Sequence, residues 1–99
     1  MLTELRYTED SPDVLNAMEN LAITKRQRGF LEAAEMLEEE VLVGRRKIGD
    51  EDSPDALNAM GNLAITKRKQ GKYAQAINIQ ERVFKLRLSL EKGYNDDVL

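Results

Sequence analysis

Residues 9–29 read EDSPDVLNAMENLAITKRQRG, and residues 51–71 read EDSPDALNAMGNLAITKRKQG. The two stretches differ at only four positions, and an offset of 42 residues relates one to the other. A unit of this length is too short to form a domain with a core of its own. A period in this range is typical of stacked repeats, in which each unit buries its apolar face against its neighbours.

Each copy carries signals for the start and the end of a helix. Ser11 and Ser53 suit the N-cap position, where the hydroxyl oxygen accepts a hydrogen bond from a free backbone N–H. A proline follows each serine, and proline is tolerated at the first helical position because its missing N–H would have had no partner there. Gly29 and Gly71 close the two copies and favour helix termination. We therefore predict one helix in each copy.

A second helix is expected after each glycine. Apolar residues recur there at steps of three or four, the spacing of one helix face. They are Ala34, Leu37, Val41 and Ile48 after the first glycine, and Ala76, Ile79, Val83, Leu86 and Leu90 after the second. No segment shows the pattern of a strand. The sequence thus predicts an all-α fold of two stacked antiparallel helix pairs.

The predicted organisation is a first repeat at 9–50 and a second at 51–92. Residues 1–8 are interpreted as the tail of a preceding repeat. Residues 93–99 are interpreted as the start of a third, because Asp97-Val98-Leu99 align with the beginning of the second repeat. On this interpretation the chain is an excerpt from a longer array.

Composition narrows the classes of partner. One third of the 99 residues are charged, both signs are mixed along the chain, and the formal net charge is −3. This balance argues against a surface built to bind nucleic acid or an anionic membrane. The absence of cysteine makes a reducing compartment the default, so we expect a cytoplasmic protein. No apolar run approaches the roughly 20 residues that span a bilayer, and no secretory signal opens the chain.

The residues for catalysis are largely missing. Without histidine or cysteine, the chain lacks the commonest general base, nucleophile and soft metal ligand. The acidic run Glu38-Glu39-Glu40 does not suggest a metal site, because consecutive helical residues point about 100° apart and their carboxylates diverge. We expect this run to form a solvated face. The sequence therefore predicts no catalytic residue, no metal site and no cofactor.

The copied residues resemble the tetratricopeptide repeat, in the 42-residue form found in kinesin light chains. The resemblance rests on Pro12-Asp13, Leu15, Asn20-Leu21-Ala22, Gly29, Ala34 and Leu37, and on their counterparts Pro54-Asp55, Leu57, Asn62-Leu63-Ala64, Gly71, Ala76 and Ile79. The chain departs from the family pattern late in each first helix, where Lys25 and Lys67 replace an aromatic residue. The resemblance implies a non-enzymatic scaffold that binds a peptide or helix of another protein in a concave groove.

Helical geometry and the resemblance together suggest binding residues. Numbering the first helix at about 100° per residue places Leu15, Met18, Leu21 and Ala22 on a core side. The resemblance implies that the other side faces the ligand, with Asn16, Asn20, Ile23 and Gln27 from the first repeat and Asn58, Asn62, Ile65 and Lys69 from the second. Side-chain amides both donate and accept hydrogen bonds, which suits a peptide main chain. The alternative is that the asparagines bond to adjacent turns and the isoleucines are merely half-buried.

Basic residues close each copied helix. Stacking would bring Lys25-Arg26 beside Lys67-Arg68 at a helix spacing of about 8–10 Å. Such a strip could attract an acidic peptide, with Arg26 and Arg68 assisting the asparagines. The alternative is that these bases only complement the helix dipole and keep the surface soluble.

The last helix carries a second apolar stripe that suggests another function. The stripe consists of Tyr73, Ile77, Phe84 and Leu88, where the first repeat has Leu31, Glu35, Leu42 and Arg46. It is expected to pack against a following repeat. Without one, the stripe, together with Val98 and Leu99, would promote self-association. The alternative function is thus a structural or self-assembling unit that stacks head to tail into a homo-oligomer.

Overall fold

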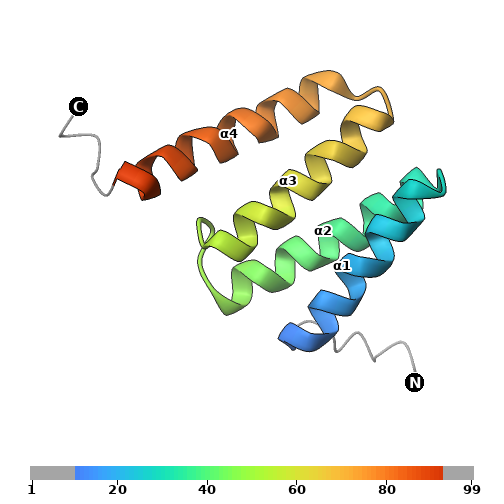
Figure 1. Cartoon of the computed structure of the whole chain (residues 1–99), viewed down its shortest axis with the longest axis horizontal. Helices are drawn as coiled ribbons and strands as arrows, with labels where there is room; N and C mark the ends of the chain where they lie inside the picture. The colour runs from blue at the N-terminus through green and yellow to red at the C-terminus, as the bar shows by residue number, and fades with distance from the viewer. Residues whose placement is uncertain (1–10, 93–99) are drawn as a thin grey trace.

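A computed structural model describes residues 11–92, and these residues form four α-helices in two antiparallel pairs (Figure 1). The helices are α1 (Pro12–Gln27), α2 (Leu31–Ile48), α3 (Pro54–Lys69) and α4 (Tyr73–Lys92). α1 packs against α2 and α3 against α4, while α2 packs against α3 and so joins the pairs into one stack. Residues 11–92 contain no strand, and the predicted all-α class is confirmed. The predicted partial repeats at 1–8 and 93–99 lie outside the described residues.

The two copied helices begin where the serines predict. The Ser11 hydroxyl accepts a hydrogen bond from the Val14 N–H at 3.4 Å, and the Ser53 hydroxyl accepts one from the Ala56 N–H at 3.2 Å. A proline occupies the first turn of each helix. Both serines are therefore N-caps, which removes one unpaired backbone donor from each helix start.

Replacing the Ser53 cap is expected to destabilise the protein. Ser53→Ala should lower the free energy of unfolding by about 1 kcal/mol, because the Ala56 N–H loses its acceptor. Ser11→Ala should cost less, since its hydrogen bond is longer. Urea denaturation followed by circular dichroism measures both, with Ser89→Ala inside α4 as the control. Equal losses for all three variants would contradict the assignment of Ser53 as a cap.

The glycines end the copied helices through their backbone conformation. Gly29 and Gly71 have φ angles of 89° and 87°, a region that side-chain-bearing residues rarely adopt. The following residues then donate backward to the last turn, Phe30 N to Lys25 O and Lys72 N to Lys67 O, both at 2.8 Å. This pattern is a Schellman motif. It turns the chain at once into the next helix.

The core lies mainly between α2, α3 and α4. Leu57 is fully buried in this core, and its counterpart Leu15 on α1 is also fully buried. The central cluster consists of Val41, Leu42, Ala56, Leu57, Ala59, Met60 and Leu63, with Met18, Ile79, Val83 and Leu86 packed at its edge. The second copied helix is therefore enclosed more completely than the first.

One predicted core residue lies outside the core. Leu21 is 48% exposed, whereas its counterpart Leu63 is 6% exposed. Leu21 lies about 120° around the helix from Leu15, on a side that only a further helix could cover. α2 covers that side of α3, but within residues 11–92 no helix covers it on α1. The two leucines differ in neighbours, not in local sequence.

Candidate binding face between the repeats

The predicted binding residues lie on two neighbouring helices, and we call their common surface the α1/α3 face. It lies beside the buried stripe of each helix rather than opposite it, since Asn16 follows buried Leu15 by about 100°. Its side chains are either exposed or half-buried. The exposed members are Asn16, Asn20, Gln27, Asn58 and Lys69, and the half-buried members are Ile23, Asn62 and Ile65. α1 and α3 are in contact, so the repeated positions of the face form two neighbouring rows.

A network of hydrogen bonds joins side chains of the α1/α3 face to α2 and to one another. Arg45 of α2 donates through Nη2 to Asn16 Oδ1 at 2.7 Å and to Glu19 Oε1 at 3.1 Å. The Asn62 side-chain amide donates to Glu19 Oε2 at 2.7 Å. Glu19 thus links α1, α2 and α3. Glu19 is not predictable from the repeat, because its counterpart in the second copy is Gly61.

The second repeat keeps part of this network. Arg87 Nη2 donates to Asn58 Oδ1 at 2.7 Å, as Arg45 does to Asn16. The shared arginine at these two positions was the signal that could have revealed the contact. Within residues 11–92, Asn16 and Asn58 thus bond to arginines of the following helices, while Ile23 and Ile65 are half-buried, as the alternative has it. Because the arginines occupy both Oδ1 atoms, the two side-chain amides keep N–H groups for another acceptor.

Two of the four bases in the predicted basic strip are neutralised by carboxylates. Arg26 Nη1 donates to Glu38 Oε2 at 2.8 Å, and also to Asn62 O and Thr66 Oγ1, both at 3.2 Å. The Arg26 side chain is almost fully buried between the repeats, so it is not a free cation at a groove rim as predicted. Lys67 is also buried and pairs with a carboxylate of α2. Arg68 and Lys69 remain exposed on α3.

Glu38 corrects the prediction of a fully solvated acidic run. Its side chain is only 2% exposed, while Glu39 and Glu40 are exposed as expected. Burial raises the pKa of the Glu38 carboxyl, against the opposing effects of the Thr66 hydroxyl and the Arg26 charge. Glu38 Oε1 has no hydrogen-bond partner within residues 11–92. Burying this carboxylate therefore lowers the stability of the contact between the repeats, and its ion pair with Arg26 offsets that cost.

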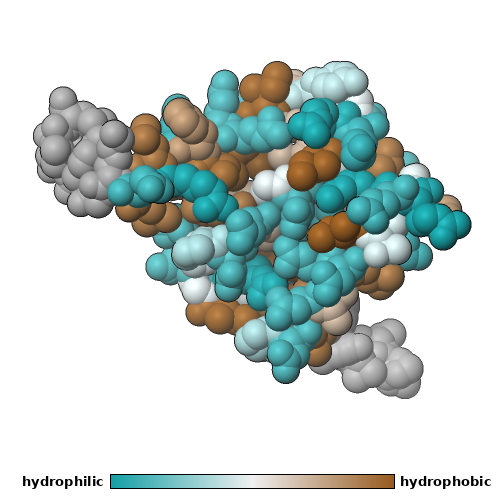
Figure 2. Space-filling view, in the orientation of Figure 1, coloured by the Kyte–Doolittle hydropathy of each residue, from teal (hydrophilic) through white to brown (hydrophobic). Residues whose placement is uncertain are grey.

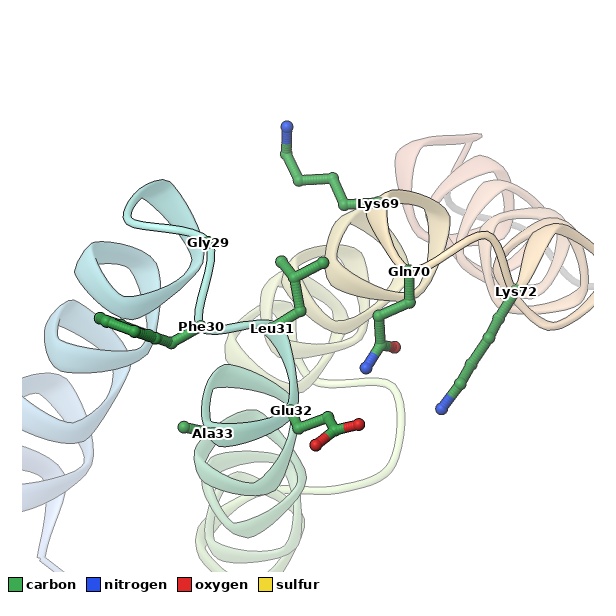
Figure 3. Close-up of a pocket in the computed structure, with 8 residues that line it drawn as sticks. All are labelled: Gly29, Phe30, Leu31, Glu32, Ala33, Lys69, Gln70 and Lys72. Atoms are coloured by element: carbon green, nitrogen blue, oxygen red, sulfur yellow. The ribbon is translucent and has the colours of Figure 1, made fainter.

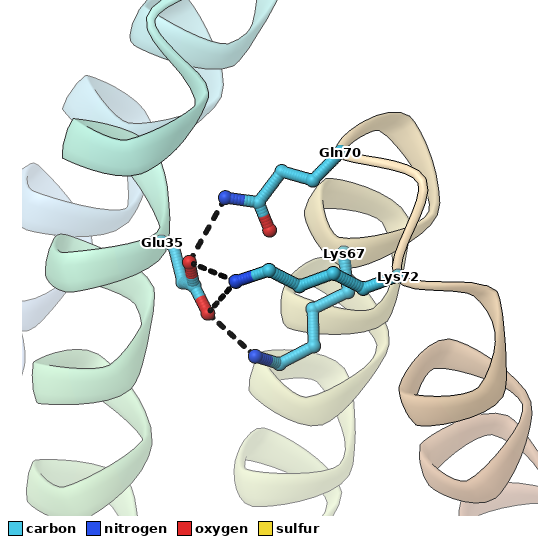
Figure 4. Close-up of polar contacts among 4 residues, drawn as sticks. All are labelled: Glu35, Lys67, Gln70 and Lys72. Atoms are coloured by element: carbon cyan, nitrogen blue, oxygen red, sulfur yellow. Dashed lines mark hydrogen bonds and ion pairs between the residues drawn. The ribbon is translucent and has the colours of Figure 1, made fainter.

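A second carboxylate of α2 holds three side chains from the end of α3 and the turn that follows it (Figure 4). Glu35 pairs with Lys67, accepts a hydrogen bond from Gln70 Nε2 at 2.9 Å and lies 3.3 Å from Lys72 Nζ. Hydrogen bonding from Lys67, and then from Gln70, lowers the pKa of Glu35 to about 2. The ionised form of Glu35 thus ties α2 to α3 and to the turn that follows.

The Glu35 cluster predicts a pH-dependent contribution to stability. Near neutral pH, Glu35→Gln should lower the free energy of unfolding by about 1 kcal/mol, a value reduced for solvent screening. Since the folded pKa lies below the unfolded value, the contribution is full above about pH 5 and is lost as the pH falls toward 2. Urea denaturation of both proteins at several pH values measures the difference. A gap of equal size at neutral pH and near pH 3 would contradict the prediction, and Glu39→Gln is the exposed control.

A depression of about 610 Å³ lies between the two turns that join the helices of each pair (Figure 3). Its lining comes from the start of α2 and from the end of α3 with the turn that follows. These residues are Gly29, Phe30, Leu31, Glu32, Ala33, Lys69, Gln70 and Lys72. Lys25 Nζ lies 5.6 Å from the centre of the exposed Phe30 ring, a cation–π distance. The sequence analysis did not predict this depression, which adjoins the α1/α3 face at Lys69.

Two further properties concern the described helices. None of the four is both long enough and apolar enough to pass through a bilayer. Within residues 11–92, no three acidic side chains come together as metal ligands would.

Comparison with known proteins identifies the family. The family model described as tetratricopeptide repeat matches residues 13–89, which span all of α2 and α3 and most of α1 and α4. No curated protein and no solved structure matches the chain significantly. Repeats of this family generally mediate protein–protein interactions and are typically non-enzymatic. The matched residues contain both helical hairpins, and the chain therefore belongs to the tetratricopeptide repeat family.

Proposed function

We propose that this protein is a non-enzymatic interaction scaffold whose α1/α3 face binds a peptide or helix of another protein. The proposal rests on one observation: the two rows of that face carry the same residue types at equivalent positions. Asn20 and Asn62, and likewise Ile23 and Ile65, occupy equivalent positions on neighbouring helices. A surface with the same polar and apolar groups at two successive places suits a ligand with a repeating main chain.

The chemistry of the rows supports main-chain recognition. Asn16 and Asn58 are held by arginines through Oδ1, so each presents N–H donors in a fixed orientation to ligand carbonyl groups. Side chains that are fixed before binding lose less conformational entropy when the ligand arrives. The half-buried Ile23 and Ile65 offer apolar contact between the amides.

The exposed basic side chains favour an acidic ligand only at one end of the α1/α3 face. Arg68 and Lys69 are exposed on α3, while Arg26 is committed to Glu38. We therefore place the acidic end of the ligand over the last turn of α3. The 42-residue period supports the kinesin-light-chain-like type of repeat, and the absence of cysteine supports a cytoplasmic location.

Selection from a random dodecapeptide library against the purified protein tests this function. Enriched peptides should bind saturably, with an affinity that falls as salt rises. Asn20→Ala combined with Asn62→Ala should weaken binding by about tenfold or more, as expected for lost hydrogen bonds to a desolvated ligand. Asn20→Ala alone, at an exposed position, keeps the test valid if loss of the Asn62–Glu19 bond unfolds the double variant.

A control on another surface decides where the selected peptides bind. Phe84→Ser changes an exposed residue of α4 far from the α1/α3 face in the sequence. It should leave binding of the selected peptides unchanged. Peptides that lose affinity for the Phe84 variant but keep it for the asparagine variants would refute the proposed face.

A further inference from the structure

The contact between α2 and α3 shows what the fold requires where one repeat stacks on the next. Two carboxylates of α2 meet two bases there. Glu35 pairs with Lys67 of α3, and Glu38 pairs with Arg26, which also donates to Thr66 Oγ1 of α3. All four charged side chains are largely buried. The charges balance, which is the condition for burying them.

The outer surface of α4 repeats this arrangement without its acids. A shift of 42 residues replaces Glu35 by Ile77 and Glu38 by Gln80, whereas Arg26 is replaced by another base, Arg68. Ile77 is 51% exposed and Phe84, the counterpart of Leu42, is 65% exposed. Tyr73 and Leu88 extend the apolar row, and Figure 2 shows apolar surface along α4. We call Tyr73, Ile77, Phe84 and Leu88 the α4 stripe.

These replacements determine which helix can pack on α4. A helix placed as α3 is placed on α2 would set its own equivalent of Lys67 against Ile77. A buried ammonium group without a counter-charge is strongly unfavourable. The same helix would meet Arg68, which has no ion pair within residues 11–92, and Gln80 is neutral where the first repeat has Glu38. A helix with an apolar residue against Ile77 and a carboxylate next to Arg68 would avoid both unfavourable contacts.

We propose that the α4 stripe docks an amphipathic helix of a partner protein. At the position that corresponds to Lys67 of α3, the docked helix carries an apolar residue. At the position that corresponds to Thr66 of α3, it carries a carboxylate that lies next to Arg68 of this protein. The docking surface shares Arg68 with the acidic end of the ligand proposed above, but it includes none of the asparagines and isoleucines of the α1/α3 face. It therefore does not depend on the peptide-binding function proposed above.

A second copy of this chain does not have that chemistry. The surface of α1 that corresponds to the α2-facing side of α3 carries Lys25 in the place of Lys67 and Thr24 in the place of Thr66. Stacking two copies in the repeat geometry would bury Lys25 against Ile77 and leave Arg68 without a carboxylate. The missing acids thus select against the head-to-tail homo-oligomer that the sequence suggested.

Three helical peptides based on residues 53–70 test the proposal. All carry a lactam bridge in place of the side chains of Asn58 and Asn62, because an isolated helix of this length is marginal in water. The first is otherwise unmodified, the second carries Lys67→Leu, and the third carries Thr66→Glu and Lys67→Leu. By fluorescence anisotropy, the second should bind the protein about tenfold tighter than the first. The third should gain several-fold more, and Arg68→Gln in the protein should remove this extra gain.

A charge exchange in the protein makes the test specific. Ile77→Glu restores an acid at the place of Glu35, at an exposed position where the fold tolerates it. This variant should reverse the order and prefer the unmodified peptide over Lys67→Leu. Asn20→Ala in the protein should change neither affinity, which separates this surface from the α1/α3 face.

Three results would overturn the proposal. The first is equal affinity of the wild-type protein for the unmodified and the Lys67→Leu peptides, and the second is no saturable binding of any of the three. The third comes from light scattering on the wild-type protein alone. A molar mass that grows with concentration and returns to the monomer value in Phe84→Ser would make a second copy the occupant of the stripe.

Discussion

Replacing Glu38 with alanine is expected to lower the free energy of unfolding by about 3–5 kcal/mol, the cost of leaving one partner of a buried ion pair alone. The substitution removes the carboxylate that lies 2.8 Å from Arg26 Nη1 and leaves a guanidinium buried between the repeats. A loss of this size is a large part of the total stability of a small domain, about 5–15 kcal/mol. Urea denaturation near neutral pH, followed by circular dichroism at 222 nm, a wavelength that reports α-helix, measures it.

The second repeat provides a matched control for Glu38. Gln80 stands at the equivalent position and is exposed, so Gln80→Ala should change the stability by less than about 0.5 kcal/mol. Burial raises the pKa of Glu38 in spite of the nearby charge of Arg26. Arg26→Met combined with Glu38→Leu should therefore recover most of the loss, because it removes both buried charges. A Glu38→Ala variant no less stable than Gln80→Ala would contradict this account.

Leu57→Ala is expected to produce the second large loss, about 2–5 kcal/mol of unfolding free energy. Leu57 is fully buried in a cluster to which α2, α3 and α4 contribute. Neighbours from three helices cannot all move inward, so the substitution leaves a cavity. Thermal and urea denaturation measure the loss.

Two other leucines serve as comparisons for Leu57. Leu15→Ala should cost less although Leu15 is equally buried, because α1 is covered on fewer sides and can settle into the space. Leu88→Ala, at a position 41% exposed, should cost under about 1 kcal/mol. A loss for Leu15→Ala that exceeds the loss for Leu57→Ala would show that the core is centred between α1 and α2 instead.

The ends of the copied helices were predictable because their signals are local. A serine and a proline start each helix and a glycine with positive φ ends it, and each acts within a few residues of itself. Burial was less predictable. Leu21 and Leu63 have almost the same flanking sequence but very different exposure, because exposure depends on which helix packs alongside.

The polar contacts of the candidate site were the hardest to predict. The sequence placed the asparagines on a common face, and the structure puts them on neighbouring helices. It did not reveal that Arg26 turns inward to Glu38 or that Arg45 reaches Asn16, since each contact joins residues from different helices. Helical spacing from Ala34 and Val41 does put Glu38 on the buried side of α2, but it does not reveal the partner that Glu38 meets there.

The difference between Glu19 and Gly61 has a consequence for how the chain folds. α1 and α3 are near-copies, so during folding either helix could occupy the place of the other, a known failure of repeat proteins. In the native arrangement Glu19 accepts hydrogen bonds from Arg45 and Asn62. In the exchanged arrangement glycine would stand there, and buried Arg45 would lose its counter-charge. A single carboxylate thus marks α1 as the first copy and directs assembly toward one of two otherwise similar topologies.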